Sequence, residues 1–107
     1  MNIAPIEPFN IDPREVTIEQ MAIQIIVKEQ ELLAAREMYE KQLSTMNELM
    51  SHLSKQQGTV ESAFNDRMIK KTITDVNELQ TVMKFIDSQL HQINTVYKAE
   101  VVKQAKA

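Results

Sequence analysis

Residues 56–59 read Gln-Gln-Gly-Thr, and Gly58 within them is the only glycine in this chain of 107 residues. The prolines all lie far earlier in the chain, at Pro5, Pro8 and Pro13. Residues 14–57 and 59–107 therefore contain neither of the two residue types that most often end or interrupt a helix. The sequence predicts an all-α fold, a long antiparallel two-helix hairpin of coiled-coil type that turns near Gly58.

The first twelve residues predict an extended, proline-containing arm. Its apolar residues recur every two or three positions, at Ile3, Ile6, Phe9 and Ile11. This spacing suits an extended strip that docks on a groove or clasps another subunit. A terminus without fixed structure is the alternative interpretation.

Two start signals mark the first helix. Asp12 followed by Pro13 is a cap with proline at the first helical position, and Thr17 with Gln20 repeats the signal as a capping box. We expect one helix over about 13–57 and a second over about 59–103, so that 13–107 forms the hairpin.

The apolar residues of both helices follow a heptad pattern, which predicts one long seam between them. The first helix has eleven seam positions, and all but Lys28 and Gln42 are apolar. The eleven are Ile18, Met21, Ile25, Lys28, Leu32, Ala35, Tyr39, Gln42, Met46, Leu49 and Leu53. The second helix has nine seam positions, and all but Thr72 are apolar. The nine are Ile69, Thr72, Val76, Leu79, Met83, Ile86, Leu90, Ile93 and Tyr97. Folding at Gly58 places the polar exceptions level with each other. We therefore expect a register-setting layer of Gln42 with Thr72, and of Lys28 with Asp87.

One seam does not use all the apolar residues. Those in excess gather at the end of the hairpin remote from Gly58, at Ile18, Ala22, Ile23, Ile25, Ile26, Val27, Val96, Tyr97, Val101 and Val102. A helix that is apolar on every side has to be buried on every side. We expect this end to bind a protein partner or further copies of the chain in a multi-helix bundle. An N-terminal arm that folds back over it in a monomer is the alternative.

Composition argues against several classes of function. The net charge is −3 with acids and bases interleaved, which disfavours nucleic-acid binding. The chain has no cysteine, and its two histidines lie far apart in the expected hairpin, so neither a nucleophilic catalytic site nor a metal site is predicted. A single glycine leaves no phosphate-binding loop. We expect no enzyme activity, no cofactor and no small-molecule substrate.

The location expected from the sequence is the cytoplasm, or export without a cleavable signal peptide. The apolar runs are too short to span a bilayer, and no basic segment followed by an apolar one opens the chain.

Three functions fit these features. The first is a small helical chaperone, adaptor or assembly factor that binds a partner through apolar helix faces. The second is a self-assembling structural subunit of a rod, scaffold or virion, in which the same faces make contacts between copies that do not close. The third is a coiled-coil spacer within a larger complex.

Overall fold

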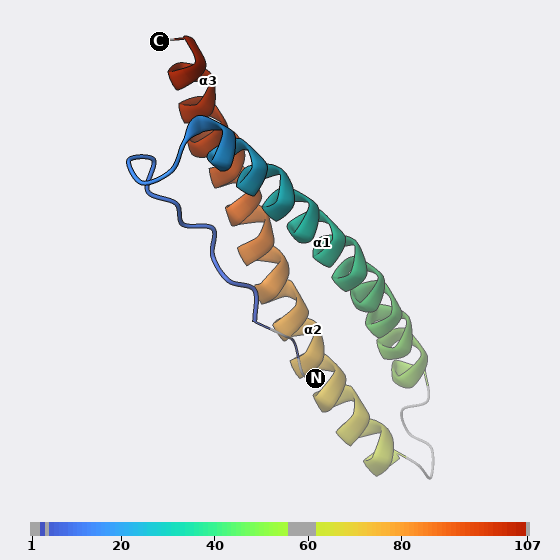
Figure 1. Cartoon of the computed structure of the whole chain (residues 1–107). Coiled ribbons are helices and arrows are strands. Elements are labelled where there is room, and N and C mark those ends of the chain that lie inside the picture. The colour runs from blue at the N-terminus through green and yellow to red at the C-terminus, as the bar shows by residue number, and fades with distance from the viewer. Residues whose placement is uncertain (1–2, 4, 56–61, 107) are drawn as a thin grey trace. The chain divides into compact units, whose positions relative to one another are not determined.

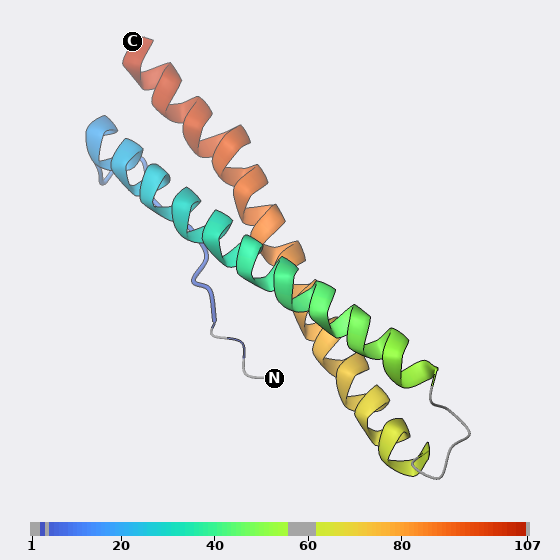
Figure 2. The same cartoon turned by 90° about the vertical axis from the view of Figure 1, so that its right-hand side faces the viewer.

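The computed structural model describes residue 3 and residues 5–55 and 62–106. Helix α1 spans Ile18–Ser54 and helix α2 spans Ser62–Gln92. The described ranges contain no strand, and the two long helices form the predicted all-α hairpin (Figure 1, Figure 2). The predicted turn at Gly58 lies outside the described residues.

Helix α1 begins at Ile18, later than the predicted start near residue 13. Thr17 and Gln20 form the capping box: the Thr17 N–H donates to Gln20 Oε1 at 3.0 Å, and the Gln20 N–H donates to Thr17 Oγ1 at 3.1 Å. Asp12 instead closes a turn, because its carboxylate accepts the Arg14 N–H at 3.0 Å and its carbonyl accepts the Glu15 N–H at 3.0 Å. Of the two start signals, only the second one starts a helix.

The helical path after α2 is not uniform. A π-helical turn, η1 (Ile93–Tyr97), follows α2 directly and leads into α3 (Lys98–Lys106). The sequence predicts one α-helix through this region to about residue 103, with no sign of the wider turn. None of the described helices has the combination of length and hydropathy needed to cross a membrane.

The chain divides into two compact units, and each contains part of both long helices. Glu37–Met83 belong to the first, which we call the 37–83 unit. Pro5–Arg36 and the chain from Lys84 onward belong to the second, which we call the arm unit. The arm unit carries most of the residues that the sequence singles out for binding.

The predicted seam is confirmed by burial. All twenty heptad positions named above are buried or half-buried, and none is exposed. In the arm unit the side chains with no exposed surface are Met21, Leu32, Ile86 and Ile93, and in the 37–83 unit the corresponding residue is Leu79. Burial of such aliphatic side chains is the main favourable contribution to a fold of this kind.

Candidate functional site

The N-terminal arm is anchored in the arm unit through Phe9, which is buried. The Phe9 N–H donates to Gln89 Oε1 at 2.7 Å, and the Tyr97 hydroxyl donates to the Phe9 carbonyl oxygen at 3.4 Å. The rings of Phe9 and Tyr97 meet edge to face, with centroids 4.6 Å apart and an interplanar angle of 85°. We call Gln89 and Tyr97 the Phe9 clamp, because together they bind the backbone and the ring of one arm residue.

The two clamp residues lie on successive elements of the second helical segment. Gln89 lies in α2, and Tyr97 ends the π-turn η1, in which Ile93 is also buried. Single π-turns inside longer helices occur often at functional sites, because the wider turn changes where the following side chains point. Here the turn ends on Tyr97, which contacts the arm.

The arm residues differ in burial. Phe9 is buried, whereas Ile6 and Ile11 are half-buried in the arm unit. Ile3, the first described residue, is also half-buried and belongs with the 37–83 unit. The structure shows the arm docked at Phe9, whereas residues 5, 7, 8 and 10 are exposed.

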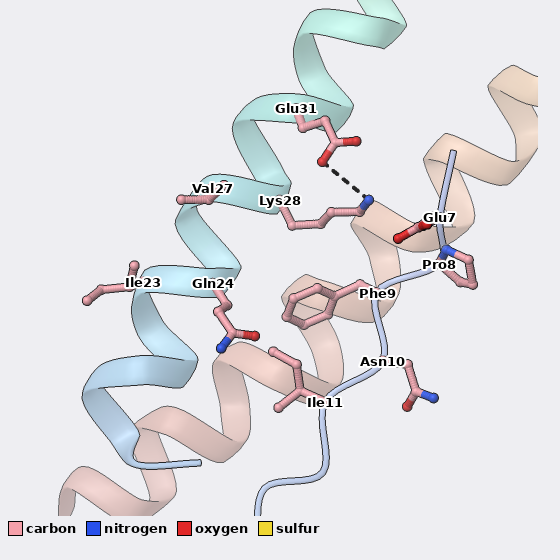
Figure 3. A pocket seen from close by; sticks show the side chains of 10 residues that line it. All are labelled: Glu7, Pro8, Phe9, Asn10, Ile11, Ile23, Gln24, Val27, Lys28 and Glu31. Carbon is pink, nitrogen blue, oxygen red and sulfur yellow. Dashed lines mark hydrogen bonds and ion pairs between the residues drawn. The ribbon is translucent and has the colours of Figure 1, made fainter. Parts of the chain in front are cut away.

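A groove of about 330 Å³ lies between the arm and α1. Figure 3 shows Gln24 and Lys28 reaching from α1 toward the arm, whereas Ile23 and Val27 point outward. Lys28 Nζ forms an ion pair with Glu31 at 3.3 Å on the α1 side. The full lining consists of Glu7, Pro8, Phe9, Asn10, Ile11, Ile23, Gln24, Val27, Lys28 and Glu31. We call this the arm groove; its lining is mixed, with charged and apolar side chains side by side.

A second groove, of about 260 Å³, lies between α1 and α3. It is lined by Ala22, Ile25, Ile26, Lys98, Val101 and Val102. Only Lys98 is polar among these residues, and its Nζ forms an ion pair with Glu29 at 2.6 Å. We call this the α1–α3 groove.

The predicted binding residues therefore fall into three classes of exposure. Five remain exposed: Ile23, Ile26, Val27, Val96 and Val102. Ile18, Ala22 and Val101 are half-buried. Ile25 and Tyr97 are buried at 3% and 9% exposure, so they leave little surface for a partner, although Ile25 lines the α1–α3 groove. Both occupy heptad positions, and the seam within the chain already covers them.

The predicted register layer of Lys28 with Asp87 is not tested as a layer, and the ion pairs of both residues are with other partners. Asp87 pairs with Arg36, whose Nε lies 2.8 Å from Asp87 Oδ1, while Lys28 pairs with Glu31 on its own helix. Arginine competes well for a carboxylate because its planar guanidinium donates in a fixed geometry.

The other predicted polar layer is untested as a pair. Thr72 is buried, but its hydroxyl donates to the Met68 carbonyl oxygen at 2.7 Å within α2, and Gln42 is half-buried.

Sequence reasoning missed Gln89, which is a polar residue at 8% exposure. Its spacing carries a signal: it lies three residues after Ile86 and four before Ile93, on the same helix face as both. A glutamine on an apolar face needs a hydrogen-bonding partner, and here the partner is the arm backbone.

Among the described residues, no three His, Asp or Glu side chains group closely enough to hold a metal ion. Hydrogen bonds from the side chain and backbone of Arg14 lower the pKa of Asp12, and the same carboxylate raises the pKa of Arg14. The arm unit therefore combines exposed apolar surface with a clamp that holds the chain's own arm. No protein-family model, curated protein or solved structure matches this chain.

Proposed function

We propose that the protein is a non-enzymatic helical interaction module, a small chaperone, adaptor or assembly factor that binds the apolar face of a partner helix in the α1–α3 groove. The observation that carries this proposal is the lining of that groove. Five of its six lining residues are apolar, and two of them, Ile26 and Val102, remain 56% and 52% exposed. Apolar side chains gathered in a groove mark an interaction site more often than isolated ones do.

The expected partner is an amphipathic helix with acidic flanks. Two neighbouring helices leave a groove into which the side-chain ridge of a third helix packs. Helix α3 carries three lysines, Lys98, Lys103 and Lys106, and one glutamate, Glu100. Its positive balance favours a partner whose apolar stripe is bordered by carboxylates.

The energy available from the groove sets the expected affinity. Burying an isoleucine or valine completely gains about 1.5–3 kcal/mol, so covering the exposed halves of Ile26 and Val102 gains roughly 2–3 kcal/mol. A micromolar complex requires about 8 kcal/mol. The partner therefore has to cover Ile23 and Val27 as well, which are more than half exposed, and further surface beyond them, because covering all four residues gains only about 3–7 kcal/mol. We expect moderate, reversible binding.

The test uses a defined probe, a fluorescent synthetic helix with leucine at its a and d positions and glutamate at e and g. Its binding to the full chain is measured by anisotropy. Ile26→Asp should weaken binding about tenfold or more, since it places a charge in the apolar groove. Ile73→Asp is the matched control, because Ile73 is also an exposed isoleucine on a helix but lies in the 37–83 unit. Equal binding by both variants would contradict the proposal, as would equal binding of a probe with lysine in place of glutamate.

Light scattering over a hundredfold concentration range separates this function from the structural alternative. A molar mass of the protein that stays fixed over this range supports the interaction module. A mass that climbs with concentration, and that Ile26→Asp returns to a single small species, would favour the self-assembling subunit instead.

A further inference from the structure

We propose that the docked arm holds the π-turn η1 in place and thereby regulates the α1–α3 groove. With Phe9 in its clamp, the valines of α3 line the groove. When the arm is released, the turn relaxes to an α-helix and brings Glu100 to the position of Val101. This inference rests on the proposed function, because the α1–α3 groove is the binding site of that function, and it assigns the regulation of the site to the N-terminal arm.

The π-turn brings the two clamp residues onto one face of the helix. Its defining bond runs from the Lys98 N–H to the Ile93 carbonyl, five residues earlier. Gln89 and Tyr97 are eight residues apart, and in an uninterrupted α-helix they would point about 80° away from each other. The wider turn takes up one residue and reduces this difference to about 20°. Both side chains therefore reach Phe9, and the clamp depends on the turn.

The same turn sets which residues of α3 face α1. In an uninterrupted α-helix the heptad spacing of the seam would continue from Tyr97 to Glu100 and Gln104, which are both polar. In the structure Val101 and Val102 line the α1–α3 groove instead, and the Gln104 side-chain amide donates to the Glu100 carboxylate at 2.9 Å within α3. Removing the turn rotates α3 by about one residue, or about 100°, and replaces an apolar side chain of the groove by a carboxylate.

Contacts with the arm favour the turn over the α-helix. An α-helix is the ordinary state of such a segment, and a π-turn persists where the contacts around it offset its cost. The Tyr97 ring meets the Phe9 ring at 4.6 Å, and its hydroxyl donates to the Phe9 carbonyl. Relaxation to an α-helix brings Val96, which has neither a ring nor a hydroxyl, to the place of Tyr97. Arm docking and groove geometry thus act on one two-state element, which is the physical requirement for coupling.

The experiment measures binding of the acidic probe helix by anisotropy to four full-length chains: the parent, Phe9→Ala, a deletion of Asn94, and the double variant. Asn94 is exposed within η1, and its deletion turns η1 into an α-helix in which Tyr97 and Val101 keep their directions. Phe9→Ala should weaken binding about tenfold. The deletion alone should bind like the parent, and it should restore binding to Phe9→Ala. Asn10→Ala, at an exposed arm residue, is the matched control and should bind like the parent.

Circular dichroism first confirms that the variants fold. Should Phe9→Ala unfold the chain, Phe9→Leu replaces it, since leucine keeps an apolar side chain in the clamp but removes the ring contact. Binding of Phe9→Ala equal to that of the parent would overturn the proposal. A double variant that stays as weak as Phe9→Ala would also overturn it, because the turn would then not be the link between arm and groove.

Methyl NMR without the probe follows the register of α3 independently of the proposed function. Nuclear Overhauser contacts from Val101 and Val102 to Ile25 or Ile26 should be present in the parent and in the double variant and be lost in Phe9→Ala. A parent chain that does not bind the probe, but shows this loss and its restoration, would contradict the proposed function and support regulation of the groove by the arm. Contacts that persist in Phe9→Ala would overturn the regulation whatever the probe does.

Discussion

At the scale of single residues, Thr17 determines where the long helix starts. The first turn of a helix has N–H groups without partners inside the helix, and a threonine side chain satisfies one of them. In this chain the Thr17 hydroxyl oxygen accepts the Gln20 N–H, and the Gln20 side-chain oxygen accepts the Thr17 N–H. Asp12 is equally suited to capping by type, but Arg14 already occupies its carboxylate.

Thr17→Ala should lower the free energy of unfolding by about 1 kcal/mol, since alanine cannot replace the capping hydroxyl. Thr45→Ala is the control, because the Thr45 hydroxyl donates to the Lys41 carbonyl in the middle of α1, where alanine is a better helix former. The control should lie within about 0.5 kcal/mol of the parent. Urea unfolding followed by circular dichroism measures both; equal losses would rule out a special role for Thr17.

The contribution of Asp12 to the free energy of unfolding should depend on pH. Its pKa lies below the ordinary value of 3.8, first because the Arg14 side chain hydrogen-bonds to its carboxylate and then because the Arg14 backbone does. A lowered pKa in the folded state means that the pair favours folding above about pH 3.8 and that this contribution disappears as the pH falls through the lowered pKa. Carbon NMR titration of the carboxyl group should give a midpoint below 3.8, and Arg14→Ala should return it toward that value. An unchanged midpoint in the variant would exclude Arg14 as the cause.

At the scale of elements, the two faces of α1 differ sharply in burial. Leu32 has no exposed surface, whereas its neighbour Leu33 is 50% exposed. Leu32→Ala should lower the free energy of unfolding by about 2–5 kcal/mol, because it removes buried methyl groups and leaves a cavity. Leu33→Ala should change it by no more than about 0.5 kcal/mol. Chemical unfolding of the pair is the measurement, and similar losses for both would mean that Leu33 is covered in solution.

The seam was predictable from sequence because burial along a helix follows a simple period. Every heptad position, including the polar Lys28 and Thr72, is at least half-buried. The period does not determine which charges meet, since long side chains reach several partners, and so Asp87 pairs with Arg36 rather than Lys28.

The clamp was only partly predictable for a related reason. Phe9 stood out as an apolar arm residue, but its partners lie 80 and 88 residues away in the chain. Gln89 has no local signal beyond its place on an apolar face. The π-turn that precedes α3 depends on packing around Ile93 and Tyr97, which a single sequence does not report.

At the scale of the whole molecule, apolar burial and surface charge contribute very differently. Two ion pairs between segments are partly exposed: the side chains of Arg36 and Asp87 are 35% and 53% exposed, and those of Lys98 and Glu29 are 44% and 28% exposed. Exposed pairs contribute about 0–1 kcal/mol each. With a net charge of only −3, repulsion across the molecule is also small.

Stability should therefore respond weakly to sodium chloride. Raising the salt from about 0.1 M to about 1 M shortens the screening length from about 10 Å to about 3 Å, which removes most of the attraction in exposed pairs. We expect the free energy of unfolding to fall by less than about 1 kcal/mol, because the buried side chains of the seam are unaffected. Sodium sulfate, which strengthens apolar burial, should instead raise it. Thermal melting in both salts is the measurement.

Arg36→Met serves as the control, since a chain lacking the pair with Asp87 should lose part of even this small response to chloride. A large destabilisation by chloride in the parent chain would mean that charge pairing, and not the apolar seam, holds the helices together.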